Sequence, residues 1–188
     1  MLTVRDIAAV IVGTGRLLRW DASGLHAYDA SLPGFWRSFT AVLVALPMDM
    51  LIHAGSLAGE SVHSPGRYAL VQVLALVMGW TAFPLLMIPI SDLLGRWPRY
   101  FRCMVALNWF RPVQSLLLLP PNLLGLIPGV SGDVQAFLTL ALLAAVLLYE
   151  WFIIARGLEV EGFTAASIVT IDLLVSFIIS GLADSISG

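Results

Sequence analysis

The sequence predicts an all-α integral membrane protein with five transmembrane helices and an amphipathic helix at the N-terminus that lies in the membrane interface. Of the 188 residues, 59% are hydrophobic and only 12% are charged, whereas a soluble domain carries about 25% charged residues. Five segments reach the ~20 apolar residues that a helix needs to cross a bilayer core. These runs are continuous and lack the alternation over ~10 residues that is typical of a membrane β-barrel. Soluble enzymes, nucleic-acid-binding domains and disordered chains are therefore excluded.

Residues 1–34 form an N-terminal segment that we expect on the cytoplasmic surface of the membrane. Apolar residues recur at helical spacing over residues 4–18, and charged residues interrupt the apolar surface. The segment matches a signal peptide poorly, and its uninterrupted apolar run is too short to cross a bilayer. We therefore predict a helix lying in the interface, with Trp20 at the level of the lipid headgroups. Ser31 followed by Pro33 then indicates the start of the next helix.

The five predicted spans make up a membrane domain over residues 35–183, which a short external tail over residues 184–188 follows. In chain order, the spans cover residues 35–56, 68–91, 101–119, 134–155 and 162–183. We expect the apolar link between the third and fourth spans to lie along the outer surface of the membrane. Prolines inside the spans each remove one backbone donor and kink a helix unless neighbouring groups compensate. These prolines are Pro47, Pro84, Pro89 and Pro112.

The distribution of arginine predicts the orientation of the chain in the membrane. All ten basic residues are arginines. With five spans, the N-terminal segment and the links after the second and fourth spans share one side, which holds eight arginines, while the other side holds only Arg67. Arginine-rich links face the cytoplasm. We therefore expect a multi-pass protein of the inner (plasma) membrane of a bacterial cell, with a cytoplasmic N-terminus and an external C-terminus.

Charged residues within the spans are the first candidates for a functional site. An acid or arginine at the bilayer centre costs about 2.5–3.5 kcal/mol on insertion scales. At ~1.5 Å per residue, Arg111 in the third span and Asp172 in the fifth lie at about the same depth, and Asp49 in the first span lies within reach of that level. We expect Arg111 to lie between the two aspartates, because unpaired charges in lipid are less favourable. Three interpretations stay open: a pair that fixes helix register, a proton or ion relay, and a charge that binds substrate.

His53 and two further polar residues complete the candidate set. His53 follows Asp49 by four residues on one helix face, so the two either share an intrahelical hydrogen bond or pass a proton. No further suitable ligand accompanies them, and we predict neither a metal site nor a cofactor. The secondary candidates are Asn108 and Glu150. Glu150 lies ~9 Å from the cytoplasmic end of its span; it either reaches the headgroups, hydrogen-bonds Asn108 or Arg102, or has a functional role.

The sequence carries no enzyme signature of the GxSxG, HExxH, Walker or dinucleotide-binding type. The net charge of −2 and the lack of a basic run give no footprint for nucleic acid. Cys103 is the single cysteine and permits no internal disulfide. We therefore predict a non-enzymatic scaffold or assembly partner that contacts the lipid bilayer and other membrane proteins or further copies of itself. The alternative is a small transporter or an ion- or proton-conducting protein that uses the buried Asp, Arg and His residues.

The stretch RYFRCMVALNWFRPVQSLLLLPPNLLGL, residues 99–126, combines an aromatic start, a proline within the helix and a proline-ended helix before a short apolar link. Together with the five closely spaced spans, this layout resembles the Yip-domain family of Rab-interacting five-span membrane proteins and their bacterial relatives. The resemblance covers residues 35–181 and implies a five-span helical fold. The acidic aromatic-Gly-Pro tract and the Gly-Tyr-Gly signature of the eukaryotic members are absent, so the resemblance implies no Rab interaction here.

Overall fold

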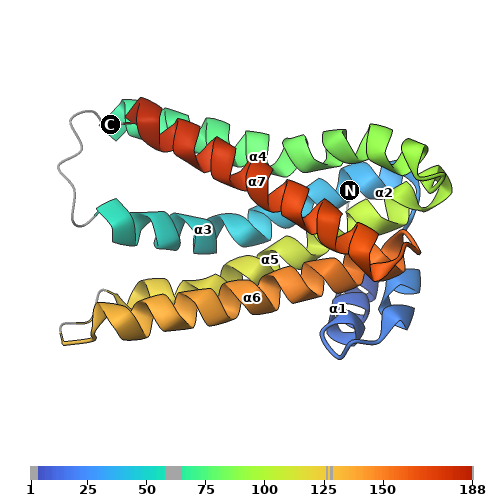
Figure 1. Ribbon diagram of the computed structural model, residues 1–188, viewed down its shortest axis with the longest axis horizontal. Coiled ribbons are helices and arrows are strands. Elements are labelled where there is room, and N and C mark those ends of the chain that lie inside the picture. The colour runs from blue at the N-terminus through green and yellow to red at the C-terminus, as the bar shows by residue number, and fades with distance from the viewer. Residues whose placement is uncertain (1–3, 58–64, 126, 128, 188) are drawn as a thin grey trace.

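The structure is a computed structural model that describes residues 4–57, 65–125, 127 and 129–187 (Figure 1). Within these ranges the chain forms α-helices and short 3-10 helices and no strand, which confirms the predicted all-α class. The α-helices are α1 (Val4–Leu17), α2 (Leu32–Ser38), α3 (Val42–Leu57), α4 (Pro65–Leu93), α5 (Tyr100–Leu124), α6 (Gly132–Gly157) and α7 (Gly162–Ser187). The 3-10 helices are η1 (Ala22–Ala27), η2 (Phe39–Ala41) and η3 (Trp97–Arg99).

Four helical segments of the described chain are long and apolar enough to cross a membrane. They are Leu32–Ile52, Gly66–Leu93, Gly132–Gly157 and Gly162–Ile186. The chain is therefore a multi-pass membrane protein by helix length and composition, and the expectation of five spans is met only in part. The remaining long helix, α5, has 25 residues, but its arginines, its asparagines and three internal prolines make it less apolar than the other four.

Two helices extend beyond the bounds that the sequence predicted. Ser31 caps the start of α2 by accepting a hydrogen bond from the Gly34 backbone N–H at 3.1 Å, and helical structure continues through η2 into α3. The first span therefore begins at residue 32 rather than 35. At the other extreme, α5 continues past residue 119 through two prolines to Leu124, so the start of the expected surface link is helical. Proline keeps a helical φ, and neighbouring groups compensate for its missing backbone N–H.

Helices α3 to α7 lie along the long axis of the molecule (Figure 1). One end, which we call the proximal end, holds α1, α2, η3 and the turn between α6 and α7. The opposite or distal end holds the last turn of α3, the connection from α5 to α6 and the end of α7. α5 packs mainly against α3 and α6, and α7 packs against α4 and α6. The five helices run alternately between the two ends (Figure 1), while a fifth crossing and the cytoplasmic side of the proximal end stay predictions.

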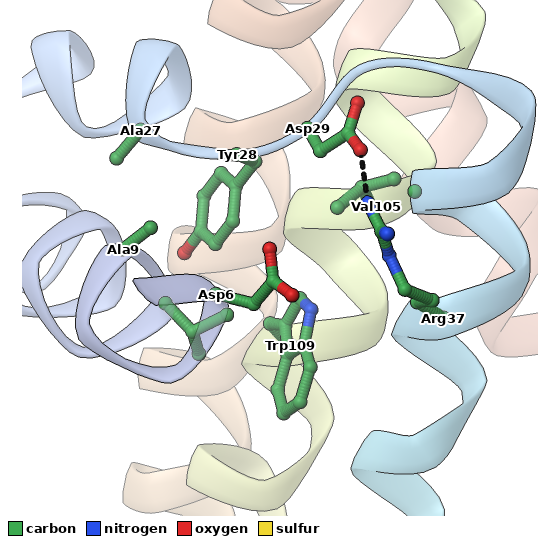
Figure 2. A pocket seen from close by; sticks show the side chains of 10 residues that line it. Asp6, Ala9, Ala27, Tyr28, Asp29, Arg37, Val105 and Trp109 are labelled. Atoms are coloured by element: carbon green, nitrogen blue, oxygen red, sulfur yellow. Dashed lines mark hydrogen bonds and ion pairs between the residues drawn. The ribbon is translucent and has the colours of Figure 1, made fainter. Parts of the chain in front are cut away.

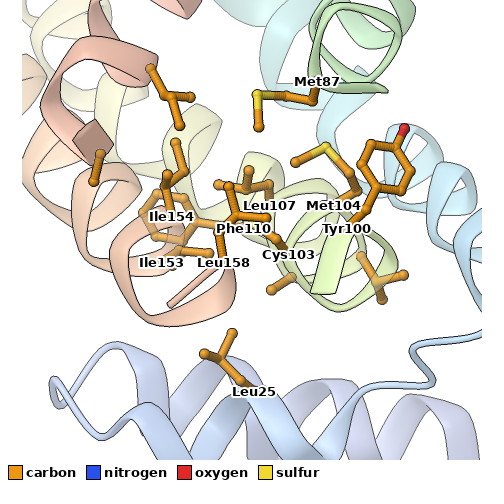
Figure 3. Packing of buried hydrophobic residues seen from close by; sticks show 14 of the residues in the cluster. Leu25, Met87, Tyr100, Cys103, Met104, Leu107, Phe110, Ile153, Ile154 and Leu158 are labelled. Carbon is orange, nitrogen blue, oxygen red and sulfur yellow. The ribbon is translucent and has the colours of Figure 1, made fainter. Parts of the chain in front are cut away.

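Buried side chains concentrate in the proximal half. Figure 3 shows this core, in which residues such as Met87 of α4, Phe110 of α5 and Ile154 of α6 meet, with Leu25 of η1 below them. Farther out the packing becomes sparse: residues 132–145 of α6 include no buried residue, and neither does the described part of α3 after residue 45. The helices also diverge toward the distal end (Figure 1). The molecule is thus a bundle that is closed at one end and open at the other.

The N-terminal helix packs on the proximal end through η1 and α5. Its inner face buries Leu17, whereas Val4, Ile7 and Ile11 form an outward apolar stripe with exposed fractions of 86%, 48% and 67%. This pattern agrees with the predicted amphipathic helix, whose place in the interface stays a prediction. The turn after Leu17 reaches Trp20, which has a φ of 60° and stacks on the ring of Tyr149 at 4.9 Å.

Candidate functional site

Arg111 lies midway along α5, where five helices come closest to a common contact. Its Nη1 donates a hydrogen bond to the Gly79 carbonyl oxygen of α4 at 2.9 Å, and its Cζ lies 4.9 Å from the centroid of the Trp80 ring. Trp80 is buried and packs against Ala41 of η2 and Ala45 of α3. A carbonyl oxygen and an aromatic face thus both stabilise the guanidinium inside the apolar bundle.

Three acids surround Arg111, each from a different helix. The carboxyl groups of Glu150 in α6 and Asp172 in α7 lie close to each other, and both acids interact electrostatically with Arg111. Asp49 of α3 also interacts with the guanidinium electrostatically. We call these four residues the charge cluster. Because α4 contributes the Gly79 carbonyl, all five long helices supply a group to this one level of the bundle.

The charge cluster holds more acid than base. One arginine faces three carboxyl groups. Full ionisation of the three acids would give the cluster a formal charge of −2 inside the apolar bundle. Among the described residues, no three of His, Cys, Asp or Glu lie close enough together to hold a metal ion. The cluster thus places acids from three helices around one buried cation.

The secondary candidates do not join each other. Asn108 is buried and donates from Nδ2 to Ser38 Oγ at 2.8 Å, and Ser38 Oγ donates to the Phe35 carbonyl oxygen at 2.6 Å. This chain of bonds ties α5 to α2. The expectation that Glu150 bonds Asn108 or reaches the headgroups is wrong, because Glu150 is only 4% exposed and turns toward Asp172.

Arg102, the other expected partner of Glu150, belongs to a separate proximal network. Its Nη2 donates to Glu159 Oε1 at 2.8 Å and to the Gly157 carbonyl oxygen at 3.3 Å. Arg99 also binds Glu159, at 2.5 Å, so one acid in the turn between α6 and α7 bridges two arginines near the start of α5. The two arginines lower the pKa of Glu159 to about 2. Sequence reasoning missed this network, because loop residues carry no periodicity.

His53 lies within α3, but its side chain is outside the part of the chain that the structure describes. The expected pair with Asp49 therefore stays a prediction. Pro112 follows Arg111 directly inside α5, and the three other expected prolines also lie within helices α3 and α4.

Comparisons of this chain with protein-family models, with curated proteins and with solved structures found no match. They give no support to the resemblance to the Yip-domain family, which stays an expectation from hydropathy and proline placement. The class of the protein accordingly follows from its fold: it is an all-helical, multi-pass membrane protein with an ionisable cluster inside its helical bundle.

Proposed function

We propose that this chain is a non-enzymatic scaffold or assembly partner in the membrane, with α5 as its fifth span and the proximal end in the cytoplasm. At 1.5 Å per residue, the 25 residues of α5 extend over about 37 Å, more than the ~30 Å of a bilayer core. α5 lies between α3 and α6, and its buried face carries Asn108 while Arg111 faces the other helices. The polar residues that lower its hydropathy therefore have protein partners rather than lipid.

The observation that carries the proposed role is the contrast between the two ends of the bundle. The proximal half is closed by a continuous core, whereas residues 132–145 of α6 and the described part of α3 after residue 45 include no buried residue. Phe137 and Leu140 of α6 are 71% and 66% exposed, and Phe177 of α7 is 63% exposed. Transmembrane helices associate through van der Waals packing of one helix against another. Divergent helices offer a partner helix more surface than a closed bundle does.

Native mass spectrometry of the gently solubilised protein tests this role. A defined complex, either an oligomer or a stoichiometric membrane partner, is expected for the wild type. The double variant Phe137→Ala and Leu140→Ala is expected to lose that complex. The matched control, Leu85→Ala and Ile88→Ala, removes exposed apolar side chains from the proximal half of α4 and is expected to retain it. A wild-type protein that is monomeric, or a complex that is unchanged in the distal variant, contradicts the proposal.

The charge excess of the cluster favours a second candidate, a small transporter or proton-conducting protein. Glu150 and Asp172 lie close together inside the bundle and would accept and release a proton there. Ionisable residues at this depth are typical of proton and ion pathways. Proteoliposomes with an internal pH-sensitive dye distinguish the candidates: transport predicts a proton flux that Asp172→Asn abolishes while the variant stays folded. Asp133→Asn, at the distal start of α6, is the control, and the scaffold predicts no flux in any of the three proteins.

A further inference from the structure

A cavity of about 220 Å³ lies between the N-terminal segment and the helical bundle (Figure 2). α1 and the chain after η1 form one side, and α2 and α5 form the other. The side chains that decide its chemistry are Asp6, Tyr28, Asp29, Arg37 and Trp109. None of these residues belongs to the charge cluster, so the cavity is a separate feature of the proximal end.

Local hydrogen bonds fix the walls of this cavity. Tyr28 is buried, and its hydroxyl group lies 2.9 Å from the Thr14 hydroxyl group of α1. Asp29 Oδ1 accepts a hydrogen bond from the Ser31 backbone N–H at 3.1 Å, and Asp29 also pairs with Arg37. Gly34 packs so closely that an added Cβ would lie 2.1 Å from the Asp29 carbonyl oxygen. The cavity is therefore built by the fold and does not depend on a loose loop.

The lining presents charges of both signs a short way apart. The Arg37 guanidinium has five N–H donors, so its pair with Asp29 leaves donors for a further anionic oxygen. Across the cavity, the Asp6 carboxylate lies beside the indole ring of Trp109 (Figure 2). A carboxylate and an aromatic face together recognise an ammonium group. The two acids and one arginine give the lining a formal charge of −1. This charge suits a ligand whose cationic group lies deepest in the cavity.

We propose that this cavity binds the headgroup of a zwitterionic phospholipid with a primary ammonium group, its phosphate at Arg37 and its ammonium group at Asp6 and Trp109. The volume is below the 300–1,000 Å³ of pockets for drug-sized ligands, so it holds a headgroup and leaves the acyl chains in the bilayer. The outward stripe of Val4, Ile7 and Ile11 on α1 places the neighbouring surface in lipid. The inference rests on the chain being a membrane protein and is independent of the scaffold or transport role.

Lipid retention measured by native mass spectrometry tests the site. The full-length protein is released from nanodiscs that contain equal amounts of phosphatidylethanolamine and phosphatidylglycerol, and each bound lipid is counted. The wild type is expected to retain phosphatidylethanolamine preferentially. Arg37→Gln removes a charge-assisted contact with the phosphate and is expected to lower that retention about tenfold. Arg156→Gln, an exposed arginine near the same end, is the matched control and is expected to leave retention unchanged.

A second variant keeps the test valid if the loss of Arg37 disturbs folding. Ala9→Leu extends an α1 side chain that lines the cavity and keeps every charge, so it is expected to lower retention by occupying the space. Equal retention of both lipids by the wild type, or retention that neither variant lowers, would overturn the proposal. Preference for phosphatidylglycerol would show attraction of an anionic surface instead. Displacement of the bound lipid by free phosphoethanolamine, with no lipid selectivity, would assign the site to a soluble ligand.

Discussion

Replacing Arg111 with methionine is expected to destabilise the bundle by about 3–5 kcal/mol. The variant keeps most of the apolar stem but loses the 2.9 Å hydrogen bond to the Gly79 carbonyl oxygen and the contact with the Trp80 ring. A hydrogen bond from a charged group contributes about 1.5–3 kcal/mol, and a cation–π contact about 0.5–2 kcal/mol. Removing the cation from a buried ion pair costs about 3–5 kcal/mol, because the acids lose their compensation. The same guanidinium makes all of these interactions, so the contributions overlap and the last range sets the expected loss.

The assay is the free energy of unfolding in mixed micelles, followed by tryptophan fluorescence as the fraction of denaturing detergent is raised. Asp172→Asn in the Arg111→Met background removes one acid and is expected to restore at least about 1 kcal/mol, which a double-mutant cycle reports as coupling. The control Arg67→Met removes an exposed arginine near the distal end of α4 and is expected to change stability by less than about 0.5 kcal/mol. An Arg111→Met protein as stable as the control, or strict additivity in the cycle, refutes the reasoning.

Three further predictions concern Glu159 and the two glycines Gly34 and Gly79. Because two arginines hold the pKa of Glu159 at about 2, below its ordinary value of 4.5, the ionised side chain stabilises the fold above pH 4.5 and this contribution is lost as the pH falls through about 2. Glu159→Gln is therefore expected to flatten the dependence of the melting temperature on pH between these values, and an unchanged profile would contradict the assignment. Gly34→Ala is expected to lower stability by about 1–3 kcal/mol, because the new methyl group meets a backbone carbonyl oxygen at 2.1 Å. Gly79→Ala, where an added Cβ meets nothing within 4 Å, is expected to raise stability by up to about 1 kcal/mol, and a Gly34→Ala protein as stable as Gly79→Ala would contradict the expected difference.

The class and the long helices followed from the sequence because a run of ~20 apolar residues has few stable alternatives to a helix in lipid. The start of the first membrane helix was equally accessible, since Ser31 and Pro33 form a local capping signal and Ser31 does cap α2. The end of the helix that contains Pro120 could not be predicted in this way. Whether a helix continues through a proline depends on the apolar surroundings and not on the proline alone.

Depth along a helix could be estimated from the sequence, but rotation about the helix axis could not. The shared depth of Arg111 and Asp172 agrees with their electrostatic contact in the structure. Glu150 was misplaced, because its distance from a helix end says nothing about which neighbour its side chain faces. That neighbour is Asp172, whose position depends on how α7 crosses α6. Contacts of this kind arise from tertiary packing and leave no periodic trace in one sequence.

The position of Arg111 explains why its loss cannot by itself separate a structural role from a transport role. α4 packs mainly against α7 rather than α5, so the bond from Arg111 to Gly79 and the contact with Trp80 tie the α4–α7 pair to the rest of the bundle at this depth. A variant without the guanidinium therefore disturbs helix geometry, and scaffolding and proton transfer would fail together. Replacing Asp172 with asparagine removes an ionisable group and leaves the Arg111 contacts with α4 in place. Substitutions of the acids, rather than of the arginine, therefore distinguish the scaffold role from the transport role.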